Sequence, residues 1–188
     1  MRVGILGGTF NPIHIGHLIL AEEVREKLNL DKVVFVPTNL PPHKDIRDIV
    51  SAKHRFSMIK SAIKENKFFC VSDLEIKRGG RSYSIDTIIQ LKKRYAHAEL
   101  FFITGSDLLK YLPEWKDINK ILKLVNFIVA SRPGYALSKL PHNITTLKIN
   151  PLAISAYEIR KRIKENRSIR YYLPKEVYKY INHEKLYQ

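Results

Sequence analysis

The residues best suited to chemistry lie close together near the start of the chain, in the run GGTFNPIHIGH at residues 7–17. His14 and His17 are three residues apart, so both imidazoles can face one bound anion at the start of a helix. Each imidazole can donate a hydrogen bond to a phosphate oxygen, and nearby phosphate charge favours its protonated form. The glycines that open the run let the backbone approach a ligand closely, and Gly16 places no side chain between the histidines. The run therefore predicts a phosphate-binding site.

Other interpretations of this run are structural. Taken singly, the glycines fit a turn and the histidines fit packing or surface positions, but together they favour an anion site between a strand and a helix. The spacing matches neither the Walker A loop, G-x-x-x-x-G-K-[ST], nor the dinucleotide fingerprint, G-x-G-x-x-G. The two histidines have no evident third partner, so the sequence predicts no metal site held by protein ligands.

Apolar runs alternate with amphipathic stretches along the chain, which predicts strands alternating with helices. The expected strands cover residues 2–6, 33–36, 68–72, 99–104, 126–130 and 145–149. The expected helices cover residues 16–28, 52–65, 84–94, 155–166 and 175–182, with a long loop over 38–50 and a basic, glycine-containing loop over 77–81. This order indicates an α/β fold: a Rossmann-like, mostly parallel sheet with helices on both faces and a small C-terminal helical extension. Ligands of such sheets bind at the carboxyl ends of the strands, where the histidine run begins.

Length, charge and cysteine content limit the class of protein. A chain of 188 residues is expected to form one domain. Its net charge of +15 implies an anionic partner, such as a nucleotide, a nucleic acid or an acidic lipid. The lone cysteine, Cys70, excludes an internal disulfide framework and fits a reducing compartment. No apolar run approaches the roughly 18 residues that span a bilayer, so we expect a cytoplasmic protein.

The run at residues 7–17 resembles the H-x-G-H signature of the nucleotidyltransferase superfamily, and more closely that of the bacterial nicotinate-nucleotide adenylyltransferases. The resemblance extends from Gly7 to Arg160. Its later motifs keep the family's order: PPHK at 41–44, SYSIDT at 82–87, GSD at 105–107, PEW at 113–115, SRPG at 131–134 and ISAYEIR at 154–160. H-x-G-H alone is shared with class I tRNA synthetases and phosphopantetheine adenylyltransferase, and the later motifs narrow the resemblance to one family.

The resemblance implies adenylyl transfer from ATP to nicotinate mononucleotide, which gives deamido-NAD and pyrophosphate in NAD biosynthesis. The mononucleotide phosphate attacks the α-phosphorus in line with the departing pyrophosphate, without a covalent intermediate. His17 is then the main donor to the α-phosphate, with His14 in support. Lys44 aims the nucleophile and Arg160 stabilises the leaving group. Mg²⁺ is expected to bridge the ATP phosphates with few direct protein ligands.

The same resemblance implies two sets of binding residues. Those expected to bind ATP are Gly7, Gly8, Thr9, Phe10, His14, His17, Gly105, Asp107, Arg132, Ser155 and Arg160. Those expected to bind the mononucleotide are Asn39, Lys44, Tyr83, Ser84 and Trp115. In the family, the Trp115 position stacks on the pyridine ring, and backbone amides near Tyr83 meet the nicotinate carboxylate. Helices from about residue 155 are expected to complete the ATP site within one nucleotidyltransferase domain over residues 1–188.

This sequence departs from the family pattern at a few positions. Ala156 and Tyr157 stand where the family usually has Ser and Thr, so hydroxyl contacts to the ATP phosphates are not expected there. The backbone N–H groups of that helix start can still bind phosphate. Ser84 occupies a usual Thr position, and Asn11 stands where the family often has Asp.

Two alternatives remain open. A sister enzyme, such as phosphopantetheine adenylyltransferase or a cytidylyltransferase, would share the histidine signature but use another acceptor. A basic nucleic-acid-binding protein would account for the net charge and the basic tail from Arg160 to Lys185, although the sequence contains no RNA- or DNA-binding motif. We expect no specific nucleic-acid partner and no membrane partner, and the sequence does not predict the oligomeric state.

Overall fold

Parallel strands form the centre of the molecule in the computed structural model, which describes residues 1–41, 47–131, 144–150 and 152–188. Within these residues the strands are β1 (Arg2–Gly8), β2 (Lys32–Pro37), β3 (Phe69–Val71), β4 (Glu99–Gly105), β5 (Asn126–Ser131) and β6 (Ile144–Lys148). They form one sheet in the order β3-β2-β1-β4-β5-β6, and every pairing is parallel. The chain begins in the middle of the sheet, builds toward one edge and then toward the other. The strand order therefore reverses between β1 and β4.

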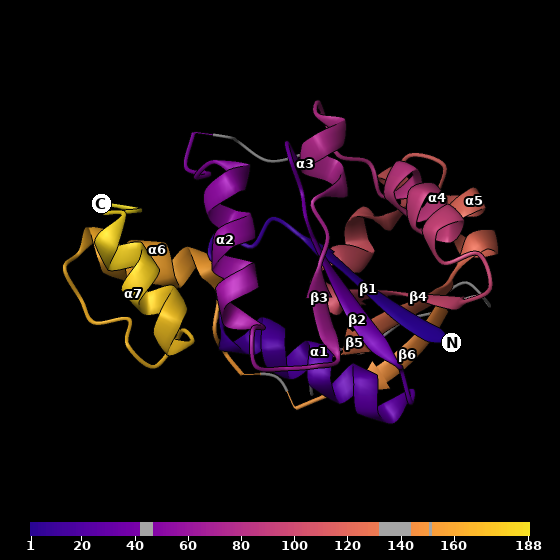
Figure 1. The fold of residues 1–188 in the computed structure, drawn as a ribbon, viewed down its shortest axis with the longest axis horizontal. Helices are drawn as coiled ribbons and strands as arrows, with labels where there is room; N and C mark the ends of the chain where they lie inside the picture. Colours follow the sequence, from indigo (N-terminus) through magenta and orange to yellow (C-terminus); the bar gives the residue numbers. More distant parts are fainter. Residues whose placement is uncertain (42–46, 132–143, 151) are drawn as a thin grey trace.

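Helices cover both faces of this sheet (Figure 1). The helical elements are α1 (Ile15–Lys27), α2 (Ala52–Ala62), α3 (Leu74–Arg78), α4 (Ser84–Arg94), the 3₁₀ helix η1 (Ser106–Glu114), α5 (Ile118–Leu124), α6 (Ala156–Lys164) and α7 (Lys175–His183). Side chains of β1 alternate between two hydrophobic clusters: Val3 and Ile5 pack with α4 and α5, whereas Leu6 packs with α1 and α2. Because both faces are covered, the central strands are nearly continuous apolar runs.

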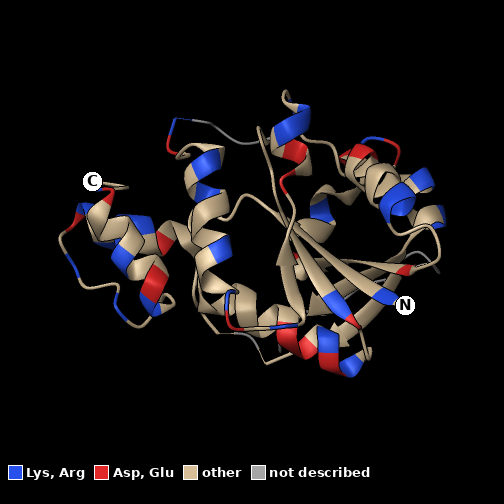
Figure 2. Cartoon of the chain, viewed as in Figure 1, with Lys and Arg blue, Asp and Glu red and all other residues tan. Residues whose placement is uncertain are grey.

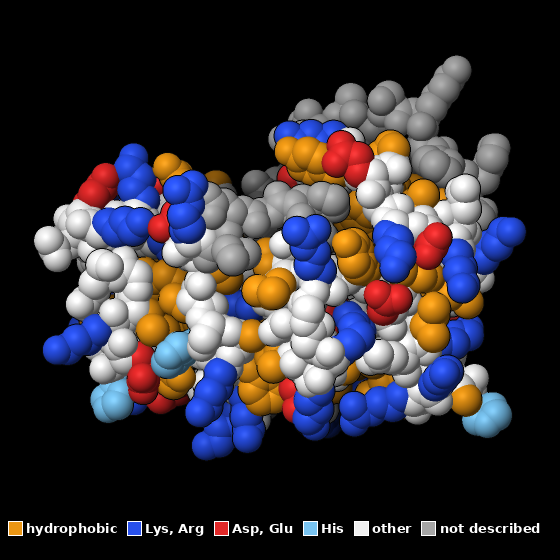
Figure 3. Space-filling view, turned by 90° about the horizontal axis from the view of Figure 1, so that it is seen from above, with side chains coloured by type: hydrophobic (Ala, Val, Ile, Leu, Met, Phe, Trp, Pro, Cys, Tyr) orange, Lys and Arg blue, Asp and Glu red, His pale blue; other side chains and the backbone are white. Residues whose placement is uncertain are grey.

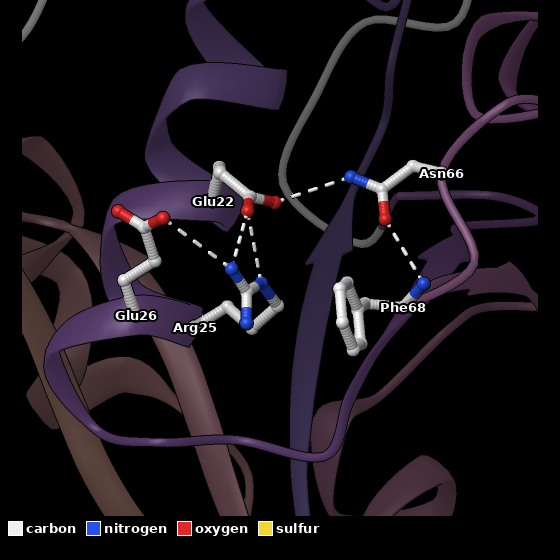
Figure 4. Close-up of polar contacts among 5 residues, drawn as sticks. All are labelled: Glu22, Arg25, Glu26, Asn66 and Phe68. Carbon is white, nitrogen blue, oxygen red and sulfur yellow. Dashed lines mark hydrogen bonds and ion pairs between the residues drawn. The ribbon is translucent and has the colours of Figure 1, made fainter.

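Glu22 on α1 ties this helix to the segment that leads into β3 (Figure 4). Arg25 donates from Nη2 and Nε to Glu22 Oε1 at 2.6 and 3.0 Å, and Asn66 Nδ2 donates to Oε2 at 3.1 Å. The hydrogen bond from Arg25 lowers the pKa of the Glu22 carboxyl. The Arg25 guanidinium also lies 4.4 Å from the centre of the Phe68 ring. These contacts fix α1, and with it the histidines at its start, relative to the sheet.

In the helical extension of α6 and α7, it is α7 that packs against α2, at one end of the molecule (Figure 1). Val177 and Ile181 on α7 are buried in the same hydrophobic cluster as Ile59 on α2. His54 on α2 shares a hydrogen bond of 2.9 Å between its Nδ1 and the Tyr180 hydroxyl. The extension is therefore continuous with the core on the α1–α2 side of the sheet.

The predicted α/β fold is confirmed: all six expected strands and all five expected helices are present. The helix α3 was not expected, and the prediction that residues 77–81 form a loop is wrong for Lys77 and Arg78, which end that helix. The elements α3 and α5 have five and seven residues, and η1 contains Pro113 and lacks the 3.6-residue period. Such short or 3₁₀ segments leave no clear periodic pattern. Within the described ranges, no helix has the length and apolar character needed to cross a membrane.

Candidate active site

Two adjoining cavities lie at the carboxyl ends of β1 and β4, where the strand order reverses. The first has a volume of about 670 Å³ and the second of about 500 Å³. Residues that line both of them are Gly7, Gly8, Thr9, Thr104 and Leu108. Open parallel sheets bind their ligands at this position. The arrangement can hold two ligands that meet at the shared wall.

The first cavity contains the residues that the sequence assigned to ATP. Its lining includes Gly7, Gly8, Thr9, Phe10, His14, His17, Gly105, Asp107, Ser155 and Arg160. Arg132 lies outside the described residues. A segment from the end of β1, one from the end of β4 and the start of α6 thus converge on one space, although they are far apart in sequence.

The two histidines form a stacked pair at the N-terminus of α1. His14 is the N-cap and is buried, whereas His17 is partly exposed. Their ring centroids are 3.7 Å apart with an angle of 30° between the ring planes, and Phe10 contacts His17 in an edge arrangement at 5.0 Å. The backbone N–H of His14 donates to Nδ1 of His17 at 3.2 Å. Because a backbone N–H is always a donor, Nδ1 of His17 is the acceptor, and the ring proton lies on Nε2. His17 therefore carries its donor on the nitrogen opposite the cap.

Glycines make room for this arrangement. A Cβ atom at Gly16 would lie 3.1 Å from Nδ1 of His14, and one at Gly8 would lie 3.1 Å from the Phe10 ring. A Cβ atom at Gly105 would collide with the Asp107 carboxylate. The sequence predicted that Gly16 leaves room for a ligand, and the structure shows that its missing side chain also leaves room for the His14 ring.

Arg160 reaches the first cavity from α6 and is held by the loop that follows β1. Its Nη1 donates to the Asn11 carbonyl at 2.8 Å. The Asn11 side chain joins three segments: Nδ2 donates to the Asp48 carbonyl at 2.8 Å, and Oδ1 accepts from the Val50 N–H at 3.2 Å and from the Tyr187 hydroxyl at 3.0 Å. An Asp at this position would lack the Nδ2 donor, so the departure from the family pattern at Asn11 supplies a loop contact.

The start of α6 also borders the first cavity. Ser155 is its N-cap, and its Oγ accepts from the Glu158 N–H at 3.1 Å. Ala156 and Tyr157 line the cavity, and Tyr157 is 67% exposed. The Arg160 guanidinium lies 6.0 Å from the Tyr157 ring centre. A large aromatic side chain thus stands where the family usually has Thr.

The second cavity contains three of the five residues that the sequence assigned to the mononucleotide: Tyr83, Ser84 and Trp115. Trp115 contacts Phe102 and Phe127 edge-on at centroid distances of 5.8 and 5.9 Å, and it remains partly exposed. These contacts hold the indole against residues of β4 and β5. Tyr83 is the N-cap of α4 and forms no side-chain cap hydrogen bond, so the first N–H groups of α4 have no side-chain partner there.

The other two predicted mononucleotide residues are not placed in this cavity by the structure. Lys44 lies outside the described residues. Asn39 is not among the residues that line the second cavity. Its N–H donates to Ser82 Oγ at 2.9 Å and its Nδ2 donates to the Gly80 carbonyl at 3.0 Å. Asn39 thus joins the loop after β2 to the segment before α4.

Sequence reasoning missed Glu75 and Thr104, which line these cavities. Glu75 on α3 is 4% exposed and accepts a hydrogen bond from Thr87 Oγ1. Burial raises the pKa of its carboxyl, while hydrogen bonds from Ser82 and Thr87 and the charges of Arg78 and Arg55 oppose that rise. Thr104 is buried and lines both cavities, and its Oγ1 has no hydrogen-bond partner within the described part of the chain.

The Lys and Arg residues of the described part of the chain are distributed over several helices and loops. Figure 2 shows Lys and Arg on the outer helices at both ends of the molecule, with Asp and Glu among them on α1, α6 and α7. On the face shown in Figure 3, the Lys and Arg side chains that the structure describes lie between hydrophobic and acidic side chains over most of the visible area. That distribution differs from the continuous basic stripe that follows a nucleic-acid backbone.

The chain is similar over its whole length to proteins of known class. The family model described as cytidylyltransferase-like matches residues 5–162. A protein of Desulfitobacterium hafniense named "Probable nicotinate-nucleotide adenylyltransferase" is 44% identical over 199 aligned residues, which cover 100% of this chain and 96% of that protein. A protein of Lactococcus lactis with the same name is 45% identical over 187 residues, which cover 100% of this chain and 95% of that protein.

A solved structure shares the fold. It is the Plasmodium falciparum nicotinic acid mononucleotide adenylyltransferase complexed with NaAD, and it superposes with a TM-score of 0.83 over 99% of this chain and 97% of that chain, at 21% identity. The fold, the paired cavities and the matching family model define the class as a nucleotidyltransferase. Within that class, the chain belongs to the nicotinate-nucleotide adenylyltransferase family. The resemblance seen in the sequence is confirmed.

Proposed function

We propose that this protein transfers the adenylyl group of ATP to nicotinate mononucleotide, forming nicotinate adenine dinucleotide and pyrophosphate. The observation that carries the proposal is the shared wall of the two cavities, formed by Gly7, Gly8, Thr9, Thr104 and Leu108. One cavity is lined by the histidine run and the other by Trp115 and the start of α4. Two nucleotides bound there would bring their phosphates together at the glycines.

The reaction needs positioning and charge stabilisation more than covalent chemistry. An oxygen of the mononucleotide phosphate attacks the α-phosphorus of ATP, and the bond to the pyrophosphate oxygen breaks on the opposite side. Holding both groups in line in adjoining cavities turns a bimolecular step into one within a complex. Negative charge on the transferring group is then stabilised by donors fixed in advance.

His17 is the best-placed donor of the described residues for the α-phosphate. Its Nε2–H lies on the ring nitrogen opposite Nδ1, the atom that accepts the His14 N–H. His14 supports the ring by stacking on it. Arg160 donates to the Asn11 carbonyl and is the one lysine or arginine among the described residues that line the first cavity. It is the residue that stabilises the departing pyrophosphate. We keep Lys44 as the residue that aims the mononucleotide phosphate, and Arg132 as an ATP contact.

On the mononucleotide side, Trp115 offers a ring face to the pyridine. The N-terminus of α4 offers backbone N–H groups and the positive end of a helix dipole to a carboxylate. A carboxylate gains more from these groups than an uncharged amide does, which favours nicotinate over nicotinamide as the acceptor's base.

Mg²⁺ is proposed to enter with ATP. The described carboxylates of the first cavity are Asp48 and Asp107, and they supply hard oxygen donors of the kind that Mg²⁺ binds directly or through water. When bound, the ion neutralises charge on the triphosphate. We also propose that residues 1–188 act as one domain, since one hydrophobic cluster joins the sheet to α6 and α7. We propose the cytoplasm as the location of the protein.

The proposal is tested by acceptor choice. The purified protein is given Mg–ATP or Mg–CTP with nicotinate mononucleotide, nicotinamide mononucleotide or phosphopantetheine, and pyrophosphate and the nucleotide product are measured. The highest kcat/KM is expected with nicotinate mononucleotide. Turnover confined to phosphopantetheine, or CTP replacing ATP as the better donor, would instead assign a sister reaction of the superfamily.

A further inference from the structure

Arg55 is a buried cation that the mechanism above does not use. It lies on α2, 1% exposed, beneath the segments that border both cavities. No ion pair joins it to a carboxylate in the part of the chain that the structure describes. Burial lowers the pKa of its guanidinium, while Tyr187 and Glu75 act through space to raise it. Burying a charged guanidinium costs free energy, which its hydrogen bonds must offset. The groups that those hydrogen bonds hold therefore indicate what the side chain does.

The guanidinium donates to three backbone carbonyls from three different segments. Nη1 donates to Thr9 at 2.8 Å, Nη2 to Asn39 at 3.0 Å and Nε to Val50 at 3.0 Å. Thr9 belongs to the shared wall of the cavities, and Asn39 follows β2 beside Thr38, which lines the second cavity. One side chain therefore sets the spacing between the loop on the ATP side and the loop on the mononucleotide side.

The contact with Thr9 also fixes the direction of a peptide group. A trans peptide is planar, and its C=O and N–H point in opposite directions. Because the Thr9 carbonyl points to the buried guanidinium, the N–H of Phe10 points away from it. Phe10 has a left-handed backbone with φ 49°, an unfavourable conformation for a bulky residue, and its N–H makes no backbone hydrogen bond within the described residues. A donor held in this way at the cavity wall is available to a ligand.

We propose that Arg55 is a positioning residue: it holds the Thr9 carbonyl so that the Phe10 N–H faces the phosphates where the two nucleotides meet. It also keeps the Asn39 segment at a fixed distance from that point. The inference rests on the proposed function for its substrate. The guanidinium acts through the backbone and touches no reacting atom.

The test compares Arg55→Lys and Arg55→Met with Met58→Ala, a buried packing change on the same helix at a side chain that has no N–H to donate to the three carbonyls. Melting temperature, kcat per folded molecule and both KM values are measured well below the melting temperature. Arg55→Met is expected to lose about 10²-fold in kcat, because a displaced donor misaligns the reacting groups. Arg55→Lys should retain more than Arg55→Met, since an ammonium can still reach one carbonyl. Met58→Ala should keep kcat within roughly twofold at an equal loss of stability.

Two results would overturn the proposal: equal kcat in Arg55→Lys and Met58→Ala at matched stability, or failure of both Arg55 variants to fold, which would make Arg55 purely structural. If the wild-type protein makes no dinucleotide, the proposed function fails. The role of Arg55 is then tested by measuring the dissociation constant of Mg–ATP by calorimetry for Arg55→Lys and Met58→Ala. A dissociation constant about tenfold higher in Arg55→Lys than in Met58→Ala would support positioning of the ATP loop. Equal constants would contradict it.

Discussion

His14 and His17 stack at a centroid distance of 3.7 Å, and the backbone N–H of His14 donates to Nδ1 of His17 at 3.2 Å. His17 thus has two separate tasks. Its Nδ1 accepts the N-cap N–H of α1, and we propose its Nε2–H as the donor to a phosphate. The two tasks predict different outcomes for different substitutions.

His17→Asn separates the two tasks, because the Asn carbonyl oxygen can accept the His14 N–H but has no group at the Nε2 position. We expect kcat/KM to fall by about 10²–10³ in both His17→Asn and His17→Ala, since both lose the donor. Only His17→Ala should also lose roughly 1 kcal/mol of stability through the missing cap. Steady-state kinetics and urea unfolding check this. Near-normal turnover in His17→Asn would remove Nε2 from the reaction.

Gly16→Ala should separate activity from stability. Alanine favours a helix over glycine by about 0.5–1 kcal/mol, so the melting temperature should stay level or rise. The new Cβ would lie 3.1 Å from Nδ1 of His14 and press on the ring that supports His17. We expect kcat/KM to fall at least about tenfold. A variant that is both stable and fully active would show that the ring pair tolerates displacement.

The histidine site could be predicted from the sequence because its parts are adjacent in the chain: glycines, histidines and the helix start lie within residues 7–17. The parallel sheet could be predicted because buried strands leave apolar runs. Arg55 and Glu75 could not be predicted, since their roles depend on burial and on partners in distant segments. The partners of Arg55 are backbone carbonyls, which every residue has, so the sequence does not show which of them Arg55 will bind. The resemblance implied that Asn39 binds the mononucleotide, but it did not show that this residue also joins the loop after β2 to the segment before α4.

Trp115→Ala should weaken mononucleotide binding selectively. Trp115 lines only the second cavity, and stacking of a base on an aromatic ring contributes about 1–3 kcal/mol, so KM for the mononucleotide should rise roughly 5- to 150-fold. KM for ATP should change little, and Trp115→Phe should keep part of the affinity. Equal effects on both substrates would make Trp115 a packing residue. The quenching of its fluorescence by nicotinate mononucleotide gives an independent check.

Tyr187→Phe should affect the ATP side. Burial raises the pKa of the Tyr187 hydroxyl, against the charges of Arg160 and Arg55, so the group stays neutral and donates to Asn11 Oδ1 at 3.0 Å. Losing this bond should lower the free energy of unfolding by about 0.5–1.5 kcal/mol. KM for ATP should rise more than KM for the mononucleotide, because the Asn11 carbonyl holds Arg160.

Tyr171→Phe is the matched control for that experiment, because Tyr171 is 82% exposed. It should leave stability and both KM values unchanged. The same loss in both variants would indicate that the Tyr187 hydroxyl adds nothing through Asn11.

Glu75 should make stability depend on pH. Burial raises the pKa of its carboxyl, so the native state holds the proton more tightly than the unfolded chain does. The free energy of unfolding therefore falls as pH rises from the ordinary Glu value of about 4.3 through the raised value. Glu75→Gln removes this fall, so the variant should gain stability relative to wild type between about pH 4.5 and pH 7.5. Urea unfolding at both pH values measures it, and a constant difference between the two proteins would contradict the assignment.

The most direct measurement is a crystal structure of the protein with nicotinate mononucleotide and a non-hydrolysable ATP analogue bound together. We expect the triphosphate beside His17 and Arg160, the pyridine ring on Trp115, and an oxygen of the mononucleotide phosphate about 3–3.5 Å from the α-phosphorus, next to the glycines at the end of β1. Nucleotides bound in separate places, with their phosphates far from Gly8 and Thr9, would contradict the account.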